Sequence, residues 1–181
     1  MNKKTILEKK QFAITIDRLC FQILERHNNL ENTAIVGLQP RGVYLSRRIK
    51  TRLSEITGKT LITYGEIDAS FYRDDFRRNE EPILPHTIAI NFDVEGKKII
   101  LIDDVLYTGR TVRSALEALL DFGRPVLVEL LVLIDRRYSR HVPIQPDYVG
   151  LTVDTRTSDK VVVEWKETSK NDMATIVNKN N

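Results

Sequence analysis

Hydrophobic and polar positions follow two periods along this chain, and the two alternate. Apolar residues recur three or four positions apart in several segments, and short continuous apolar runs typical of buried strands lie between them. The alternation implies an α/β fold with a mostly parallel central sheet flanked by helices. The pattern predicts helices over 9–27, 43–56, 112–120 and, as a short closing element, 172–177. It predicts strands over 34–38, 61–67, 99–102, 126–134, 148–153 and 161–165, with 87–92 pairing nearby.

Length and composition agree with a single domain over residues 1–181. The chain is 41% hydrophobic and 29% charged, which is ordinary for a globular fold with a sizeable core. No apolar run approaches the ~20 residues that a membrane helix requires, and no signal peptide is visible. We therefore expect a cytoplasmic protein that does not enter a membrane.

The single cysteine and the net charge exclude few further classes of protein. Cys20 excludes an intramolecular disulfide, and it lies at helical spacing from Ile16, Leu19, Ile23 and Leu24, so we expect a buried, inert thiol. A net charge of +3 is compatible with anionic substrates and does not by itself require a nucleic-acid partner.

The strongest chemical signal is a pair of carboxylates at the end of an apolar run. Asp103 and Asp104 directly follow residues 99–102, which places them at the carboxyl end of a buried strand, where open α/β sheets bind ligands. Adjacent strand residues point to opposite faces, so one aspartate faces the ligand more directly than the other. Carboxylates suit vicinal ribose hydroxyls or a hydrated Mg²⁺.

A small, hydroxyl-rich loop comes next. Gly109 permits close backbone approach and positive φ, and Thr111 is a candidate N-cap for the helix that follows. Free N–H groups at a helix start attract phosphate. An ordinary strand–loop–helix connection is the alternative, but the preceding apolar run and aspartate pair favour a site for a phosphorylated sugar.

The string from Ile102 to Arg113 resembles the phosphoribosyl-diphosphate (PRPP) signature of type I phosphoribosyltransferases, and of the PyrR family in particular. Members of that family combine uracil phosphoribosyltransferase activity with RNA-dependent attenuation of the pyrimidine operon. The likeness covers nearly the whole chain. Its supporting strings are residues 37–42, 65–68, 72–75, 122–125 and 133–136.

The resemblance implies a type I phosphoribosyltransferase fold with a small hood and a flexible lid, acting on PRPP and uracil with Mg²⁺ to give UMP and pyrophosphate. It implies a homodimer or a dimer of dimers. Asp103, Asp104 and Arg41 are the implied catalytic residues, and Asp103 and Asp104 are also candidate ligands of the Mg²⁺ that PRPP carries. The implied pyrophosphate loop is Gln39, Pro40, Arg41 and Gly42, for which a Pro-Gly turn with a surface arginine is the alternative. The implied PRPP-binding residues are Ile102, Asp103, Asp104, Val105, Leu106, Tyr107, Thr108, Gly109, Arg110 and Thr111.

Two further segments complete the implied site. The lid spans about 71–86, a long charged stretch whose alternative is a plain mobile hairpin tip. The hood spans about 135–160 and would hold the base. The implied lid residues are Tyr72, Arg73, Asp74, Arg77 and Arg78. The implied uracil contacts are Asp135, Arg136, Val153, Asp154, Thr155, Lys160 and Val161.

RNA binding is a weaker expectation than catalysis. Gln145 replaces an arginine of the family's hood, Pro40 replaces a threonine, and Asp17 adds an anion on the first helix where RNA-binding members carry a threonine. Arg137, Tyr138 and Arg140 offer partial compensation in a loop that Arg136 begins. Leader RNA is therefore a doubtful partner. We expect a solvated helix face at Arg47, Arg48, Lys50 and Arg52, and surface histidines rather than catalysts at His27, His86 and His141.

Overall fold

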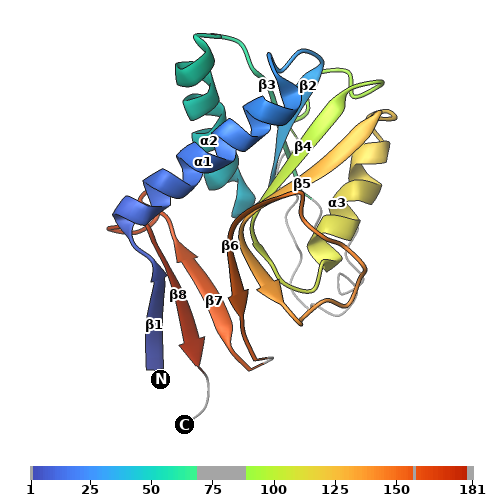
Figure 1. Ribbon diagram of the computed structural model, residues 1–181. Coiled ribbons are helices and arrows are strands. Elements are labelled where there is room, and N and C mark those ends of the chain that lie inside the picture. Colours follow the sequence, from blue (N-terminus) through green and yellow to red (C-terminus); the bar gives the residue numbers. More distant parts are fainter. Residues whose placement is uncertain (1, 69–88, 157, 179–181) are drawn as a thin grey trace.

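The computed structural model describes residues 2–68, 89–156 and 158–178 (Figure 1). Within these ranges the chain forms two sheets and three helices. The elements in order are β1 (Asn2–Leu7), α1 (Lys9–His27), β2 (Thr33–Leu38), α2 (Gly42–Thr57), β3 (Thr63–Ile67), β4 (Lys98–Leu106), α3 (Arg110–Leu120), β5 (Leu127–Arg137), β6 (Tyr148–Asp154), β7 (Lys160–Glu164) and β8 (Met173–Asn178).

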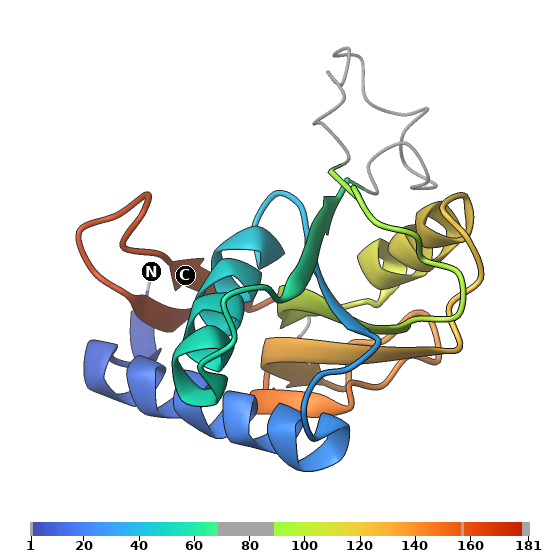
Figure 2. The ribbon, with the colours of Figure 1, turned by 90° about the horizontal axis from the view of Figure 1, so that it is seen from above.

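The larger sheet is parallel throughout, in the order β3-β2-β4-β5-β6, as the alternation of elements predicts. Helices α1 and α2 cover one face and α3 covers the other (Figures 1 and 2). Alternate residues of β4 serve the two faces: Ile100 and Ile102 pack in the core beneath α1 and α2, while Ile99 and Leu101 pack beneath α3. The central strand β4 is therefore buried on both sides.

The smaller sheet is antiparallel, in the order β1-β8-β7, and it joins the two ends of the chain (Figure 1). The prediction of a closing helix over 172–177 is wrong, because this segment is β8. Its β-branched residues Thr175, Ile176 and Val177 favour a strand, and both partner strands lie far away in the sequence. The periodicity also gave no sign of β1. The predicted hood boundaries of 135–160 overlap this sheet only at Lys160.

Other boundaries lie close to the predictions, with two instructive differences. Strand β4 continues through the aspartate pair to Leu106, and α3 begins at Arg110 with Gly109 as its N-cap. The expectation of Thr111 as the N-cap is therefore wrong. Of the segment 87–92, Ala89 forms an isolated antiparallel bridge with Glu66, while residues 87 and 88 lie outside the described ranges.

Burial agrees with the expectation for Cys20 and contradicts it for His27. Cys20 is fully buried, and burial raises the pKa of its thiol to about 12, so it is inert. His27 is buried as well, at the end of α1, rather than on the surface. Across the described residues, no helix is both long and apolar enough to span a bilayer.

His27 belongs to a charged cluster at the amino-terminal edge of the central sheet. Its Nε2 contacts a carboxylate oxygen of Glu129, which also accepts a hydrogen bond of 3.0 Å from the Tyr148 hydroxyl. Arg26 Nε lies 2.7 Å from the other oxygen of Glu129. We call Arg26, His27, Glu129 and Tyr148 the Glu129 cluster. It connects α1 to the first residues of β5 and β6.

Candidate functional site

The carboxyl end of β4 delivers the two aspartates to different surroundings. Asp103 continues the face of Ile99 and Leu101, is partly exposed, and lines a cavity of about 210 Å³. Asp104 continues the opposite face and is only 6% exposed. The remaining residues around the cavity are 105–112, so Asp103 and the loop that follows form one concave site, while Asp104 lies outside its lining. The structure thus brings Asp103 and the glycine loop together.

Both carboxyl groups lie in surroundings that resist their ionisation. Burial raises the pKa of Asp103, the carboxylate of Asp104 raises it further, and the backbone N–H of Asp104, 2.9 Å from Asp103 Oδ1, opposes the rise together with Arg41. Burial also raises the pKa of Asp104, and Arg41 gives the largest opposing effect. The pair therefore favours a ligand that brings cations or hydroxyl donors.

The loop between β4 and α3 is shaped for an anion. Gly109 has φ +85°, a conformation that glycine adopts without strain. Its carbonyl accepts the first hydrogen bond of α3 from Arg113 at 3.0 Å, and the Thr108 hydroxyl accepts one from the Arg110 N–H at 3.4 Å. The N–H groups of a first helical turn lack partners within the helix, and the helix dipole favours negative charge beside them. A phosphate group suits this position.

The segment after β5 holds that loop in place. Backbone N–H groups of His141 and Val142 donate to the Thr108 carbonyl at 2.9 and 3.2 Å. Arg140 donates to the carbonyl of Tyr107 at 2.6 Å, and the Arg136 guanidinium lies 4.0 Å from the centre of the Tyr107 ring. The sequence shows these arginines only as a basic cluster, because no local pattern reveals which distant carbonyls they bind.

The loop Gln39–Gly42 meets the aspartate pair from the neighbouring strand. Its Gln39–Pro40 peptide is cis. Arg41 Nε donates to Asp104 Oδ2 at 3.0 Å, and its Nη2 donates to the carbonyl of Val163 in β7. A Cβ at Gly42 would lie 2.4 Å from the Ile102 carbonyl oxygen, so only glycine lets α2 begin this close to β4. The predicted pyrophosphate loop and the strand-end carboxylates therefore share one site.

The seven predicted uracil residues do not form one cluster. Arg136 is buried and donates to the Thr155 hydroxyl at 3.0 Å, on the side of the strand that carries the Tyr107 contact. Asp135 pairs instead with Arg140, and Asp154 pairs with Arg137 at 2.6 Å. Val153 and Val161 are core residues, and Lys160 is exposed. The predicted lid residues Tyr72, Arg73, Asp74, Arg77 and Arg78 lie outside the described residues.

The donor set at the aspartate pair fits a hard cation held jointly with a substrate. Among the described residues, no group of three or more histidine, cysteine, aspartate or glutamate side chains could hold a metal alone. Two adjacent carboxylates nevertheless offer the oxygen ligands that Mg²⁺ prefers, and Mg²⁺ commonly completes its shell with water and substrate phosphate oxygens. Asp103 and Asp104 therefore fit a Mg²⁺ ion that arrives with a phosphorylated ligand.

Sequence comparison identifies relatives along nearly the whole chain. A family model described as the phosphoribosyl transferase domain matches residues 2–169. The Bifunctional protein PyrR of Elusimicrobium minutum is 46% identical over 180 residues, which cover 99% of each sequence. The protein of the same name from Bacillus subtilis is 41% identical over 180 residues, covering 97% of this chain and 98% of that protein.

Structural comparison confirms the predicted type I phosphoribosyltransferase fold. The hypoxanthine phosphoribosyltransferase of Trypanosoma cruzi matches with a TM-score of 0.71 at 15% identity, covering 95% of each chain. A hypoxanthine-guanine phosphoribosyltransferase of Bacillus anthracis matches with a TM-score of 0.69 at 18% identity, covering 96% of this chain and 98% of that one.

Proposed function

The chain belongs to the PyrR family of phosphoribosyltransferases, and on that premise we propose that it transfers the phosphoribosyl group of PRPP to uracil, giving UMP and pyrophosphate. One observation carries the proposal: Asp103 and the Gly109 loop at the start of α3 line a single cavity, with Asp104 next to Asp103 in the chain. This arrangement offers acceptors for sugar hydroxyls beside donors for a phosphate.

We assign the parts of PRPP to the parts of the site. The 5′-phosphate binds the first N–H groups of α3 and the hydroxyls of Thr108 and Thr111. The ribose hydroxyls donate hydrogen bonds to Asp103, which faces the cavity. The pyrophosphate lies toward Arg41, whose side chain is 46% exposed and can turn from Asp104 toward a ligand. This assignment is supported because the start of α3, Asp103 and the loop that carries Arg41 meet at the ends of β2 and β4.

The reaction forms a bond between uracil N1 and C1′ of the ribose and breaks the bond between C1′ and the pyrophosphate oxygen, while the N1 proton leaves uracil. Negative charge grows on the departing pyrophosphate, and Arg41 stabilises it by charge-assisted hydrogen bonds. Mg²⁺, when bound with PRPP, supplies further positive charge at the pyrophosphate. Asp103 and Asp104 orient the ribose, so catalysis consists mainly of positioning and electrostatic stabilisation.

We place the base on the Arg136 side of β5. The Arg136–Tyr107 contact and the Thr155 hydroxyl lie together there, beside the predicted phosphate loop. The segment 71–86 lies outside the described residues and stays the predicted lid, whose closure would exclude water from the reacting centre. The homodimer or dimer of dimers stays a prediction that sedimentation analysis would test.

A PRPP- or UMP-responsive attenuator that binds leader RNA is the second candidate, because the relatives are named bifunctional. Exposed Tyr138, beside Arg137, offers a ring on which an unpaired base can stack. However, Arg136 and Arg140 donate to internal carbonyls and to Asp135, and Asp17 pairs with Arg52 at 2.6 Å. These contacts leave fewer cations for phosphates, so we rank this candidate below catalysis.

Purified protein tested with PRPP, Mg²⁺ and a panel of bases separates the candidates. The enzyme proposal expects UMP from uracil and little product from guanine, hypoxanthine or orotate. Absence of product from every base would refute it. The attenuator proposal expects salt-sensitive binding to pyrimidine-operon leader RNA that UMP strengthens, and equal affinity for leader and scrambled RNA would refute that.

A further inference from the structure

We propose that Trp165 is a positioning residue for Asp104, and that its indole N–H serves as the donor to this buried carboxylate when Arg41 turns toward pyrophosphate. The role of Asp104 in holding PRPP rests on the proposed function. The placement of Trp165 beside Asp104 does not. Trp165 is the only tryptophan in the chain, and it follows directly after β7.

The end of β7 lies against Asp104. Val163 and Trp165 are 2% and 1% exposed, and both belong to the core cluster that contains Ile100 and Ile102. The Arg41 guanidinium connects β7 to the site, because it donates both to Asp104 Oδ2 and to the Val163 carbonyl. Asp104 continues the face of β4 that carries Ile100 and Ile102, so Trp165 lies in the core on the side of β4 where Asp104 lies.

The indole N–H of Trp165 is available as a hydrogen-bond donor. No group in the described part of the chain accepts a hydrogen bond of normal geometry from it, although a buried N–H without a partner is costly. Trp165 nevertheless acts on Asp104: burial raises the pKa of that carboxyl group, and Arg41, the Val105 backbone N–H and the Trp165 side chain oppose the rise. The unpartnered indole N–H and the buried carboxyl group thus lie on the same side of β4, which makes Asp104 the acceptor that we propose for it.

Arg41 cannot serve Asp104 and pyrophosphate equally well. Its Nε is the cationic partner of Asp104, and its exposed side chain is also the candidate pyrophosphate ligand. When the guanidinium turns toward the leaving group, Asp104 loses its cation while Asp103 remains adjacent. The Val105 backbone N–H then remains as a donor, and a buried carboxylate with so few donors is disfavoured. The Trp165 N–H supplies a second donor that does not move with Arg41.

Three contacts hold the indole in position. The Phe12 ring meets it edge-on at 5.3 Å, the Tyr44 ring lies 6.0 Å away, and the Arg48 guanidinium lies 5.0 Å from its centre. Arg48 in turn donates to Glu167 at 2.7 Å and to Asp172 at 2.7 Å, which fixes the loop after Trp165 onto α2.

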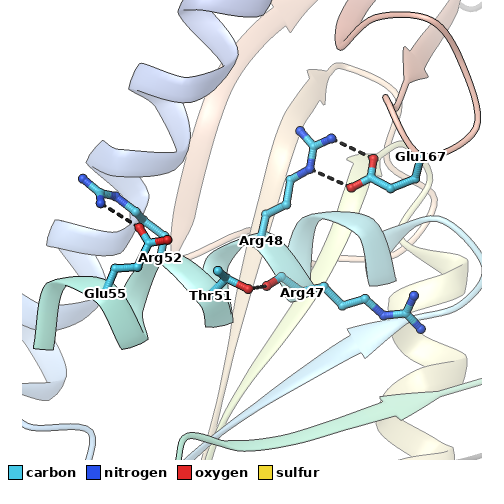
Figure 3. A pocket seen from close by; sticks show the side chains of 6 residues that line it. All are labelled: Arg47, Arg48, Thr51, Arg52, Glu55 and Glu167. Carbon is cyan, nitrogen blue, oxygen red and sulfur yellow. Dashed lines mark hydrogen bonds and ion pairs between the residues drawn. The ribbon is translucent and has the colours of Figure 1, made fainter. Parts of the chain in front are cut away.

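Figure 3 shows Arg48 directed at Glu167, and both residues line a cavity of about 360 Å³. The cavity is lined by cations, but they are already paired: Arg52 contacts Glu55 at 2.9 Å, and Arg47 contacts Glu66 at 2.8 Å. We therefore interpret these pairs as a structural support for Trp165 rather than as an anion site.

The substitution Trp165→Phe tests the role of the N–H, because it keeps an aromatic ring against Phe12 and Tyr44. We expect kcat/KM for PRPP to fall about tenfold, the scale of one hydrogen bond to a charged group, while KM for uracil stays nearly unchanged. The matched control Phe12→Leu loosens the packing on the same ring but keeps the N–H. It should lower the unfolding midpoint and leave KM for PRPP unchanged. The proposal would be overturned if Trp165→Phe left kcat/KM for PRPP unchanged, or if it raised KM for uracil by the same factor by which it lowered kcat/KM for PRPP.

A second measurement needs no turnover. Trp165 is the sole indole, so the intrinsic fluorescence of the wild-type protein reports on its surroundings. We expect the emission of Asp104→Asn to differ from that of the wild type at one fixed pH, because the substitution changes the group that the indole N–H faces. The control Glu167→Gln, which removes a charge from the Arg48 contacts, should leave the emission nearly unchanged. Identical emission from Asp104→Asn and the wild type would contradict the inference, even if uracil transfer itself were disproved.

Discussion

Two buried acidic sites occupy opposite edges of the central sheet, and they are built differently. At the amino-terminal edge, one carboxylate, Glu129, pairs with the Arg26 guanidinium and contacts His27 and the Tyr148 hydroxyl. At the carboxyl edge, the described residues set one cation, Arg41, against two carboxylates, Asp103 and Asp104. The first site has more partners than acid groups, while the described part of the second has more acid groups than cations.

The difference separates a structural cluster from a binding site. A buried carboxylate that already has a cation and polar groups around it can stabilise the fold without a ligand to balance its charge. An under-compensated pair of carboxylates destabilises the folded protein and is relieved by a ligand that brings positive charge or hydroxyl donors. The surplus of acid groups at one edge therefore indicates function more reliably than burial does.

The largest expected effect comes from neutralising the functional pair. Asp103→Asn combined with Asp104→Asn should lower the rate of UMP formation by more than about a thousandfold, because the ribose loses both acceptors and the metal loses its carboxylates. Circular dichroism should show an intact fold. A double variant with near-normal turnover would contradict the assignment of the ribose anchor.

Removing the Glu129 carboxylate should lower stability and leave turnover nearly unchanged, which is the opposite of the result expected for the Asp103–Asp104 pair. Glu129→Ala leaves His27 and Tyr148 buried without their acceptor, so the free energy of unfolding in urea should fall by about 3 kcal/mol. Turnover per folded molecule should stay near that of the wild type. The control Asp147→Asn removes the charge from the longer Arg26 contact of 3.6 Å at the same edge and keeps a side-chain oxygen for the Leu130 N–H, now 2.9 Å away, so it should change stability by less than about 1 kcal/mol.

The pH dependence of stability sharpens the comparison. The raised pKa of Asp103 means that the folded protein binds its proton more tightly than the unfolded chain does, so this residue lowers stability as pH rises above its ordinary pKa. Asp103→Asn removes the penalty, and it should increase the unfolding free energy by about 1 kcal/mol at pH 8, since partial exposure to water moderates the shift. The gain should vanish below about pH 4. If the gain in unfolding free energy were the same at every pH, it would not come from the titration of Asp103.

The smallest expected effect concerns the glycine of the phosphate loop. An alanine at Gly109 meets Val142 and Ile144 at ordinary distances of 3.4–3.6 Å, so its cost is the left-handed backbone, about 1 kcal/mol. Gly58→Ala is a matched control, with φ +67° and open space around it. Both variants should lose similar stability, but only Gly109→Ala should raise KM for PRPP.

Local patterns predicted the strand–loop–helix unit from β4 to α3 well, because the apolar run, the aspartates and the glycine all lie within one short stretch. The β1-β8-β7 sheet escaped prediction, since Asn2–Leu7 is largely polar and its partner lies at the other end of the chain. Partners of charged residues escaped for the same reason. Nothing near His27 in the sequence indicates Glu129, and nothing near Arg140 indicates the carbonyl of Tyr107.

The pairing of β1 with β8 has a consequence for how the protein is made. Asn2 pairs with Asn178, so the contact joins almost the first residue to almost the last. Closing so long a loop is slow compared with local helix formation. During synthesis the central sheet can assemble while β8 is still inside the ribosome. The wall beside Asp104, which β7 and Trp165 provide, is completed only after the final strand emerges, so an unfinished chain holds the phosphate loop before it holds a working site.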